Sequence, residues 1–361
     1  MILQDKNLYF IGGVVRDEIL GLSSLDIDLT YNGNAIEFAK TIDEAEILRI
    51  NEPFGTVRIK IDNDEIDIAS TRSESYPQKG HLPVINKIGC SLKEDVMRRD
   101  FTINALAKST LTGKIIDYTG GLEDIKNKTL RVLHDDSFVD DPTRIVRGLK
   151  FAVRFGFELD EHTKKLQDDY LDNINYDMSY KRLKKELVET FSLNKWEAFE
   201  RFVNQGIYKL VSPKKFILPK YNFSNLIKKF EVKNIWIIYA GLLPNILNLP
   251  LTKSEKQIVE GFMKLKSLKL CGEFEIYKIF KTIPIESVIM YSTINHEIVE
   301  KYLNVIKDID IFINGNDLKN LGIEPSQKYQ ECFDYILCKK FENLKLTKDD
   351  EIKLAKKFFQ K

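Results

Sequence analysis

Residues near the N-terminus have the types and spacing needed to hold a phosphate. Residues 11–16 read I-G-G-V-V-R and lie between an apolar run at 8–11 and a helix-like stretch at 14–20. Glycines at such a strand–turn–helix junction let backbone N–H groups approach a phosphate, and the helix N-terminus adds a partial positive charge. We therefore expect Gly12, Gly13 and Arg16 to form a phosphate-binding turn.

A pair of aspartates follows this turn. Residues 25–29 read L-D-I-D-L, and alternate residues of a strand share a face, so Asp26 and Asp28 form a carboxylate pair. Two like charges this close need a cation, and their hard oxygens favour Mg²⁺ shared with substrate phosphates. Beside the glycine turn, the pair predicts phosphoryl or nucleotidyl transfer. The alternative is an ordinary βαβ unit with two solvent-facing aspartates.

A third carboxylate is predicted nearby. Residues 54–61 and 65–69 are typical of two strands joined by a turn at 62–64. Asp67 lies between two isoleucines of the second strand, where it either joins Asp26 and Asp28 or is a surface residue of an edge strand.

A polar segment and a charged cluster come next. Residues 70–92 contain two prolines and two glycines and are predicted to form a mobile loop. Residues 92–106 predict a helix-rich element interrupted near 98–100. There Arg98, Arg99 and Asp100 either hold a triphosphate and ribose hydroxyls or form a surface ion-pair cluster.

A basic helix is expected from residue 141 onward. Asp141 is a natural N-cap and Pro142 suits the first helical position. Arg144, Arg147 and Lys150 recur every three residues beside an apolar face, which on its own predicts an amphipathic helix with a basic solvent face.

An Asp–Arg pair on that helix also has a functional interpretation. A carboxylate accepts from an exocyclic amine and a guanidinium donates to a ring nitrogen, so one pair suits both cytosine and adenine. Uracil and guanine invert this pattern and leave buried polar groups unpaired, which discriminates strongly against them. Such a pair admits CTP and ATP without choosing between them.

Length and composition bound the class of protein. A chain of 361 residues with 43% hydrophobic and 30% charged residues indicates a soluble globular protein with two or three structural units. No apolar run is long enough to cross a membrane, so we expect a cytoplasmic protein. Since the net charge is only +1, RNA binding would need a local basic face.

The chain changes character near residue 140. Strand signals become rare and helical periodicity rich in Lys and Glu continues to the C-terminus. The prediction is an α+β protein with a catalytic α/β head at 1–139. The family resemblance described below further implies a helical neck carrying the base-recognition helix at 140–200, and a helical body and tail that bind RNA at 201–361.

Several motifs resemble the tRNA nucleotidyltransferase and poly(A) polymerase family of bacteria and eukaryotes. G-G-V-V-R-D followed by D-I-D resembles its motif A, and R-R-D-F-T-I-N-A at 98–105 its motif B. Residues 117–125 with 130–133 resemble motif C, and 140–147 resemble motif D. Residues 179–187 resemble a later family helix, and 313–318 with 321–322 a segment near the C-terminus of bacterial members.

The resemblance implies a polymerase-β-like head and the addition of C, C and A to the 3′ end of tRNA from CTP and ATP. Asp26 and Asp28 would bind Mg²⁺, with Asp67 as a further catalytic candidate. Asp141 and Arg144 would recognise the base and Arg147 the triphosphate, while the helical part would hold the acceptor stem of tRNA through its phosphates. The implied nucleotide-binding residues are Gly12, Gly13, Arg16, Arg99, Asp100, Asn104, Asp141, Arg144 and Arg147.

Alternatives stay open within and outside this family. The family usually has Glu at the position of Asp140, often Arg at Lys150 and often Glu at Lys181, so the fine geometry of the nucleotide contacts is not fixed. An enzyme adding only A, only CC or a poly(A) tail would share the motifs, although the long segment at 70–92 disfavours CC addition alone. Outside the class, the chain could be a small-molecule adenylyltransferase or a non-catalytic RNA-binding module.

Overall fold

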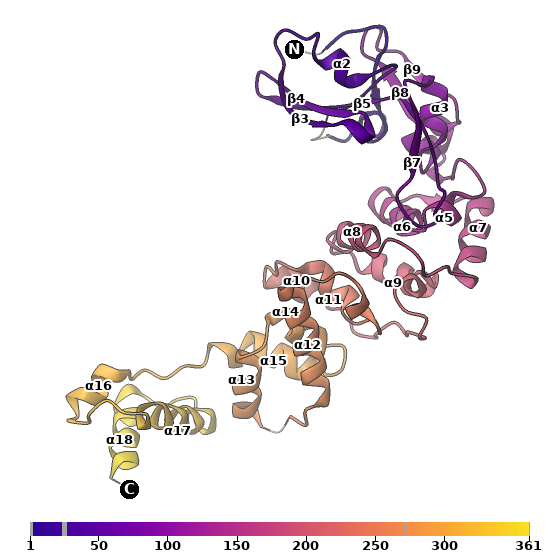
Figure 1. Ribbon diagram of the computed structural model, residues 1–361. Coiled ribbons are helices and arrows are strands. Elements are labelled where there is room, and N and C mark those ends of the chain that lie inside the picture. Colours follow the sequence, from indigo (N-terminus) through magenta and orange to yellow (C-terminus); the bar gives the residue numbers. More distant parts are fainter. Residues whose placement is uncertain (1–2, 24–26, 271, 361) are drawn as a thin grey trace. The chain divides into compact units, whose positions relative to one another are not determined.

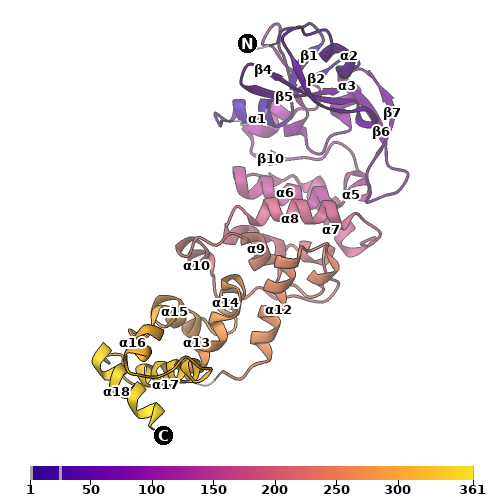
Figure 2. The same ribbon diagram turned by 60° about the vertical axis from the view of Figure 1, so that its left-hand side comes forward.

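The computed structural model describes residues 3–23, 27–270 and 272–360 (Figures 1 and 2). The chain divides into two compact units, one formed by residues up to 218 with 243–250 and the other by 219–242 with 251 onward. The four motifs that resemble the nucleotidyltransferase family all lie in the first unit. The boundaries at 139/140 and 200/201 within the predicted head, neck and body stay predictions.

The head is built on a seven-stranded mixed sheet with the order β3-β4-β5-β2-β1-β8-β9. Strands β2 and β5 run parallel, and the other neighbouring strands are antiparallel. The strands are β1 (Leu8–Ile11), β2 (Ile27–Tyr31), β3 (Glu46–Asn51), β4 (Thr56–Ile61), β5 (Asp64–Ser70), β8 (Leu106–Ser109) and β9 (Ile115–Asp117).

The strand–glycine–helix prediction is confirmed. Strand β1 leads through Gly12 directly into α1 (Gly13–Ile19). Gly12 has φ 72° and ψ −123°, a backbone conformation open in practice to glycine alone. Leu29, Ile59 and Ile68 from neighbouring strands pack beneath α2 (Ala35–Ala39) in the core of the sheet.

The predicted hairpin at 54–69 is also confirmed, as β4 and β5. The mobile-loop prediction for 70–92 is wrong in part, because β6 (Arg72–Ser75) and β7 (Val84–Ile88) pair as an antiparallel hairpin. Its tip is fixed by backbone hydrogen bonds from Gly80 N to the Asp140 carbonyl, 2.9 Å, and from Ser179 N to the Gly80 carbonyl, 3.0 Å. The short strands have no apolar alternation, so long-range contacts rather than a local pattern decide their pairing.

The interrupted helical element at 92–106 appears as α3 (Leu92–Met97) and the 3₁₀ turn η2 (Thr102–Asn104). A capping box at Ser91 begins α3. After β9, the Asp117 carboxylate accepts hydrogen bonds from the backbone N–H groups of residues 119–122 and shapes the glycine turn into α4 (Gly121–Lys126).

A helical layer follows the head in the first unit. Leu149 of α6 is buried, as are Leu183 and Leu187 of the adjacent α8. Helix α6 begins one residue later than predicted, because Pro142 is its N-cap and the Asp141 carboxylate accepts from Thr143 N, 3.2 Å, and Thr143 Oγ1, 2.6 Å. The elements are α5 (Ser137–Asp140), α6 (Thr143–Phe155), α7 (Glu161–Asp172), α8 (Tyr180–Phe191), α9 (Trp196–Asn204), η3 (Ile207–Leu210) and η4 (Ile246–Asn248), with a short parallel pair of β10 (Thr129–Leu130) and β11 (Glu158–Leu159).

The second unit is helical throughout its described residues, which confirms the helical remainder. Near its C-terminal end, the buried Glu351 carboxylate pairs with Lys340 Nζ at 2.7 Å and accepts from the backbone N–H groups of Phe312, 2.6 Å, and Ile313, 3.1 Å. No helix in the described part of the chain is long and apolar enough to span a membrane. The helices are α10 (Ser224–Lys229), α11 (Ile235–Ala240), α12 (Lys253–Ser267), α13 (Glu273–Lys281), α14 (Ile285–Tyr291), α15 (His296–Asn304), η5 (Ile306–Asp308), α16 (Gly315–Asn320), α17 (Lys328–Glu342) and α18 (Lys348–Phe359).

Candidate active site

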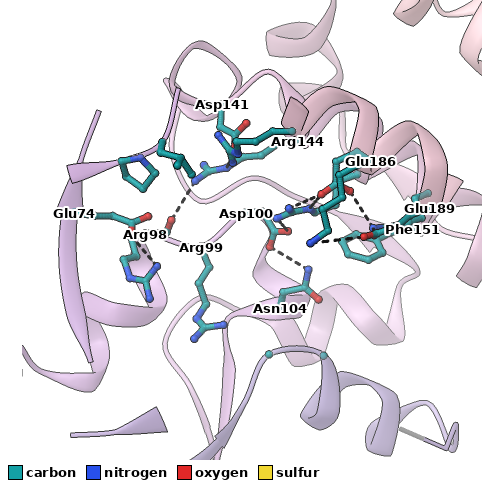
Figure 3. A pocket seen from close by; sticks show the side chains of 18 of the residues that line it. Glu74, Arg98, Arg99, Asp100, Asn104, Asp141, Arg144, Phe151, Glu186 and Glu189 are labelled. Carbon is teal, nitrogen blue, oxygen red and sulfur yellow. Dashed lines mark hydrogen bonds and ion pairs between the residues drawn. The ribbon is translucent and has the colours of Figure 1, made fainter. Parts of the chain in front are cut away.

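A cavity of about 500 Å³ lies in the first unit between the glycine turn, the β6–β7 hairpin, α3, α6 and α8 (Figure 3). Nine Arg and Lys side chains and five carboxylates line it, so its walls favour a polyanion. All the residues expected to bind nucleotide border this one cavity: Gly12, Gly13, Arg16, Arg99, Asp100, Asn104, Asp141, Arg144 and Arg147.

Arg99 lies against the glycine turn. A Cβ on Gly12 would come within 3.0 Å of Arg99 Nη1, so the absence of a side chain at Gly12 gives the guanidinium its place. Arg99 Nη2 pairs with Asp95 at 3.1 Å, whereas the buried Nε has no hydrogen-bond partner among the described residues. A buried donor left unpaired is costly, and an anion in the cavity would satisfy it.

Arg16 borders the cavity with its guanidinium already engaged. It donates to Asp17 at 2.6 and 2.8 Å and to Asn104 Oδ1 at 2.5 Å, and it lies over the Phe155 ring with 4.6 Å to the centroid. Burial lowers the pKa of Arg16. In this arrangement Arg16 orients Asn104, whose amide nitrogen donates to Asp100 at 3.0 Å.

A buried ion-pair network forms one wall of the cavity. The Asp100 carboxylate accepts from Arg147 at 3.2 Å, and Arg147 also donates to Glu186 at 2.6 Å. Lys150 pairs with Glu186 at 3.0 Å and with Glu189 at 2.5 Å. Burial raises the pKa of Glu186, but Arg147 and Lys150 outweigh burial and hold it below its usual value.

The two simpler interpretations made from sequence are therefore wrong here. The basic stripe of α6 is not a solvent face, because Arg144 is only 3% exposed and the other two cations pair with Glu186 of α8. The charged residues at 98–100 form ion pairs, but buried ones that line the cavity rather than a surface cluster.

The cavity also brings Asp141 and Arg144 together (Figure 3). Asp141 is 2% exposed, and its carboxylate lies 4.0 Å from Arg144 Nε. Arg182 of α8 forms a close ion pair with Asp141, and Arg144 donates to Ser137 Oγ at 2.8 Å.

Sequence analysis assigned no role to Arg182, Glu186 or Tyr76, which also line the cavity. A signal existed for the first two. They lie four residues apart on a helix and so share one face, and their charges complement those of the Asp141 and α6 side chains that they meet. Nothing local distinguished Tyr76.

Two of the predicted carboxylates, Asp28 and Asp67, lie on the sheet rather than in this cavity. Asp28 is exposed on β2 and lies opposite Asp67 of β5 in parallel register, which places both on one face; Asp26 is outside the described residues. Asp67 is paired with Arg58 of β4 at 2.6 and 2.8 Å. The edge-strand alternative is wrong, because β5 lies between β4 and β2.

The donors present suit a divalent metal. Asp28 and Asp67 supply hard carboxylate oxygens from neighbouring strands. Within residues 3–23, 27–270 and 272–360, no group of three or more His, Cys, Asp or Glu side chains lies close enough together to hold a metal ion.

Comparison with known proteins points to one family. Residues 8–131 match the model of the poly A polymerase head domain. The chain is 31% identical to the A-adding tRNA nucleotidyltransferase of Geobacter sulfurreducens over 96% of its own length, but spans only 44% of that relative. It is 28% identical to the A-adding tRNA nucleotidyltransferase of Halalkalibacterium halodurans, covering 98% of this chain and 89% of that one.

The fold agrees with these matches. A solved structure of a CCA-adding enzyme in an apo form superimposes with a TM-score of 0.79 and 26% identity, covering 96% of this chain and 90% of the other. Head, helical remainder and motif order thus agree across sequence and structure. Residues 8–131 thus form a poly A polymerase head domain, and the chain as a whole is similar in sequence and fold to A-adding and CCA-adding tRNA nucleotidyltransferases.

Proposed function

We propose that this protein is a CCA tRNA nucleotidyltransferase, which adds C, C and A to the 3′ end of tRNA from CTP and ATP and releases pyrophosphate. The observation that carries the proposal is the buried Asp141–Arg144 pair on one side of a cavity that also holds Arg99 with an unpaired Nε. A carboxylate and a guanidinium side by side suit the amine and ring nitrogen of cytosine and adenine, and reject uracil and guanine.

Different residues of the cavity would bind different parts of the nucleotide. Arg99 and the turn at Gly12 and Gly13 would hold the triphosphate, and Arg16 would fix Asn104 beside the sugar. Asp100 would keep Arg147 in place while Asp141 and Arg144 select the base. Preorganised, water-poor contacts of this kind position the nucleotide without reorganisation during the reaction.

A divalent metal fits the face that carries Asp28. Nucleotidyltransferases of this family generally use one, and we propose Mg²⁺ held by Asp26 and Asp28, with Asp67 beside Asp28 on β5. When bound, the ion would make the tRNA 3′-hydroxyl a better nucleophile and neutralise charge on the departing pyrophosphate. The role of Arg58 would be to hold the Asp67 carboxylate in one orientation.

A second candidate function is the addition of A alone. Two relatives that match nearly the whole of this chain are A-adding enzymes, whereas a similar solved structure is a CCA-adding enzyme. The Asp141–Arg144 pair serves either activity, because the pair accepts both bases.

The deciding experiment uses three tRNA transcripts that end before CCA, after C and after CC. Each is incubated with the protein, Mg²⁺ and labelled CTP or ATP, and the products are resolved at single-nucleotide length. Completion of CCA on all three supports the proposal. Addition of one A to the CC-ended transcript alone identifies an A-adding enzyme, and no incorporation by a folded protein that binds tRNA contradicts both. Asp28→Ala is the control, expected to abolish incorporation while tRNA binding persists.

A further inference from the structure

Tyr76, the residue that follows β6, joins the hairpin to the base-reading arginine. Its hydroxyl lies 3.2 Å from Arg144 Nη2 and 3.4 Å from Glu74 Oε1. Its ring also faces the Arg144 guanidinium, with 5.8 Å from Cζ to the ring centroid. All three residues line the nucleotide cavity.

The direction of these two hydrogen bonds follows from the groups themselves. A guanidinium only donates hydrogen bonds, and a carboxylate only accepts them. The single hydroxyl proton of Tyr76 is therefore donated to Glu74, and the hydroxyl oxygen accepts a hydrogen bond from Arg144. Glu74 is buried and held by Arg98 at 3.0 Å and Arg72 at 3.3 Å. The Tyr76 oxygen is thus fixed as an acceptor that faces Arg144.

The remaining partners of Arg144 belong to other elements. Nη1 donates to Ser137 Oγ of α5 at 2.8 Å and lies 3.5 Å from His134 Nε2, and Nη2 donates to the Arg98 carbonyl at the end of α3, 3.2 Å, besides Tyr76. Nε lies 4.0 Å from the Asp141 carboxylate. Of these contacts, only the one from Tyr76 comes from the hairpin.

We propose that Tyr76 is a positioning residue for Arg144 and thereby determines which bases the enzyme accepts. The inference rests on the proposed function, because it concerns how the same site selects its nucleotide. With the Tyr76 acceptor in place, Arg144 donates in one fixed direction, which suits the ring nitrogen of cytosine or adenine. Without it, the guanidinium can turn toward the carbonyl oxygen of uracil or guanine.

The test is Tyr76→Phe, which removes the hydroxyl and keeps the ring. We expect the preference for ATP over GTP and for CTP over UTP to fall about tenfold, mainly through KM, while the dissociation constant for tRNA stays unchanged. Tyr9→Phe is the matched control, because it removes a tyrosine hydroxyl that donates to the Lys6 carbonyl at 3.1 Å, outside the cavity. Unchanged selectivity in Tyr76→Phe would overturn the inference.

A double-mutant cycle with Arg144→Lys separates positioning from a direct contact. If Tyr76 acts through Arg144, Tyr76→Phe changes the dissociation constants of the four nucleotides in the native background but not in the Arg144→Lys background. Equal effects in both backgrounds would contradict the proposal. Calorimetric nucleotide binding keeps this test independent of catalysis: a wild-type protein that selects CTP and ATP without incorporating them would contradict the proposed function alone.

Discussion

Arg99 reaches the glycine turn because Gly12 has no side chain. The buried Nε of Arg99 has no hydrogen-bond partner among the described residues. An anion bound next to the Gly12 turn would therefore accept a hydrogen bond from this Nε. At the scale of single residues, the positive φ of Gly12 favours glycine at this turn, and the missing side chain leaves room for Arg99.

Gly12→Ala should therefore weaken nucleotide binding more than it weakens the fold. The new Cβ adds backbone strain of about 1–3 kcal/mol and lies 3.0 Å from Arg99 Nη1, which must move. Gly113→Ala is the control, because Gly113 also has a positive φ of 69° but no atom within 4 Å of its Cβ position. We expect the two variants to have similar melting temperatures, and only Gly12→Ala to have a higher nucleotide dissociation constant. Equal nucleotide affinities of the two variants would refute the role of Gly12.

At the scale of elements, two buried carboxylates link α6 to its neighbours. Asp100 links the motif at 98–105 to α6, and Glu186 links α8 to α6. Burial raises the pKa of Asp100, but Arg147 and Asn104 outweigh burial and hold it below its usual value, as Arg147 and Lys150 do for Glu186. A carboxyl whose pKa is depressed by folding stabilises the protein above its unfolded pKa, here about 4, and this contribution is lost as the pH falls through the folded pKa.

The melting temperature of the protein should therefore fall steeply below about pH 4. Glu186→Gln keeps the size of the side chain but removes its charge from between Arg147 and Lys150, and should cost about 3 kcal/mol at pH 7. The difference in stability between the native protein and Glu186→Gln should shrink as the pH falls, which thermal unfolding from pH 7 to pH 3 measures. A difference that stays constant over this pH range would show that the depressed pKa of Glu186 is not the source of its stabilising effect.

Another element-scale contact holds the helices near the C-terminus. Glu351 of α18 pairs with Lys340 of α17, and both side chains are buried. The Glu351 carboxylate also accepts hydrogen bonds from the backbone N–H groups of residues 312 and 313. Glu351→Ala should lower the free energy of unfolding by about 3–5 kcal/mol, because it leaves a buried Lys340 without its partner. Glu342→Ala, which breaks the exposed pair with Lys339, should change it little in the same urea titration. Equal losses of unfolding free energy in Glu351→Ala and Glu342→Ala would mean that burial of the ion pair is unimportant.

At the scale of the whole molecule, the net charge is close to zero although the nucleotide cavity is strongly basic. Binding of a long polyanion would then depend on local groups of cations rather than on overall attraction. The proposed tRNA partner should still bind through phosphate contacts.

The dissociation constant for tRNA is expected to rise steeply between about 50 and 200 mM salt, because each phosphate contact releases counterions and adds about 0.7–0.9 to the logarithmic slope. Filter binding over a KCl series measures it, and unlabelled duplex RNA of matched length serves as competitor. Affinity that does not change with salt would contradict binding through phosphates.

The sequence by itself determined the glycine turn, the β4–β5 hairpin and the basic helix. These depend on local spacing: a turn needs glycine where φ is positive, and a strand or helix has a period that can be counted. The family motifs then indicated that the separate stretches belong to one site.

Only the tertiary structure decided what those residues meet. It buried the cations of α6 against Glu186, gave Asp141 the partner Arg182, and paired β6 with β7 where the sequence indicated a loop. It also placed Tyr76 on Arg144, residues 68 positions apart in the chain. Such contacts have no sequence period, because they arise where packing brings distant segments together, and the free energy of burying a charge depends on the partner found there.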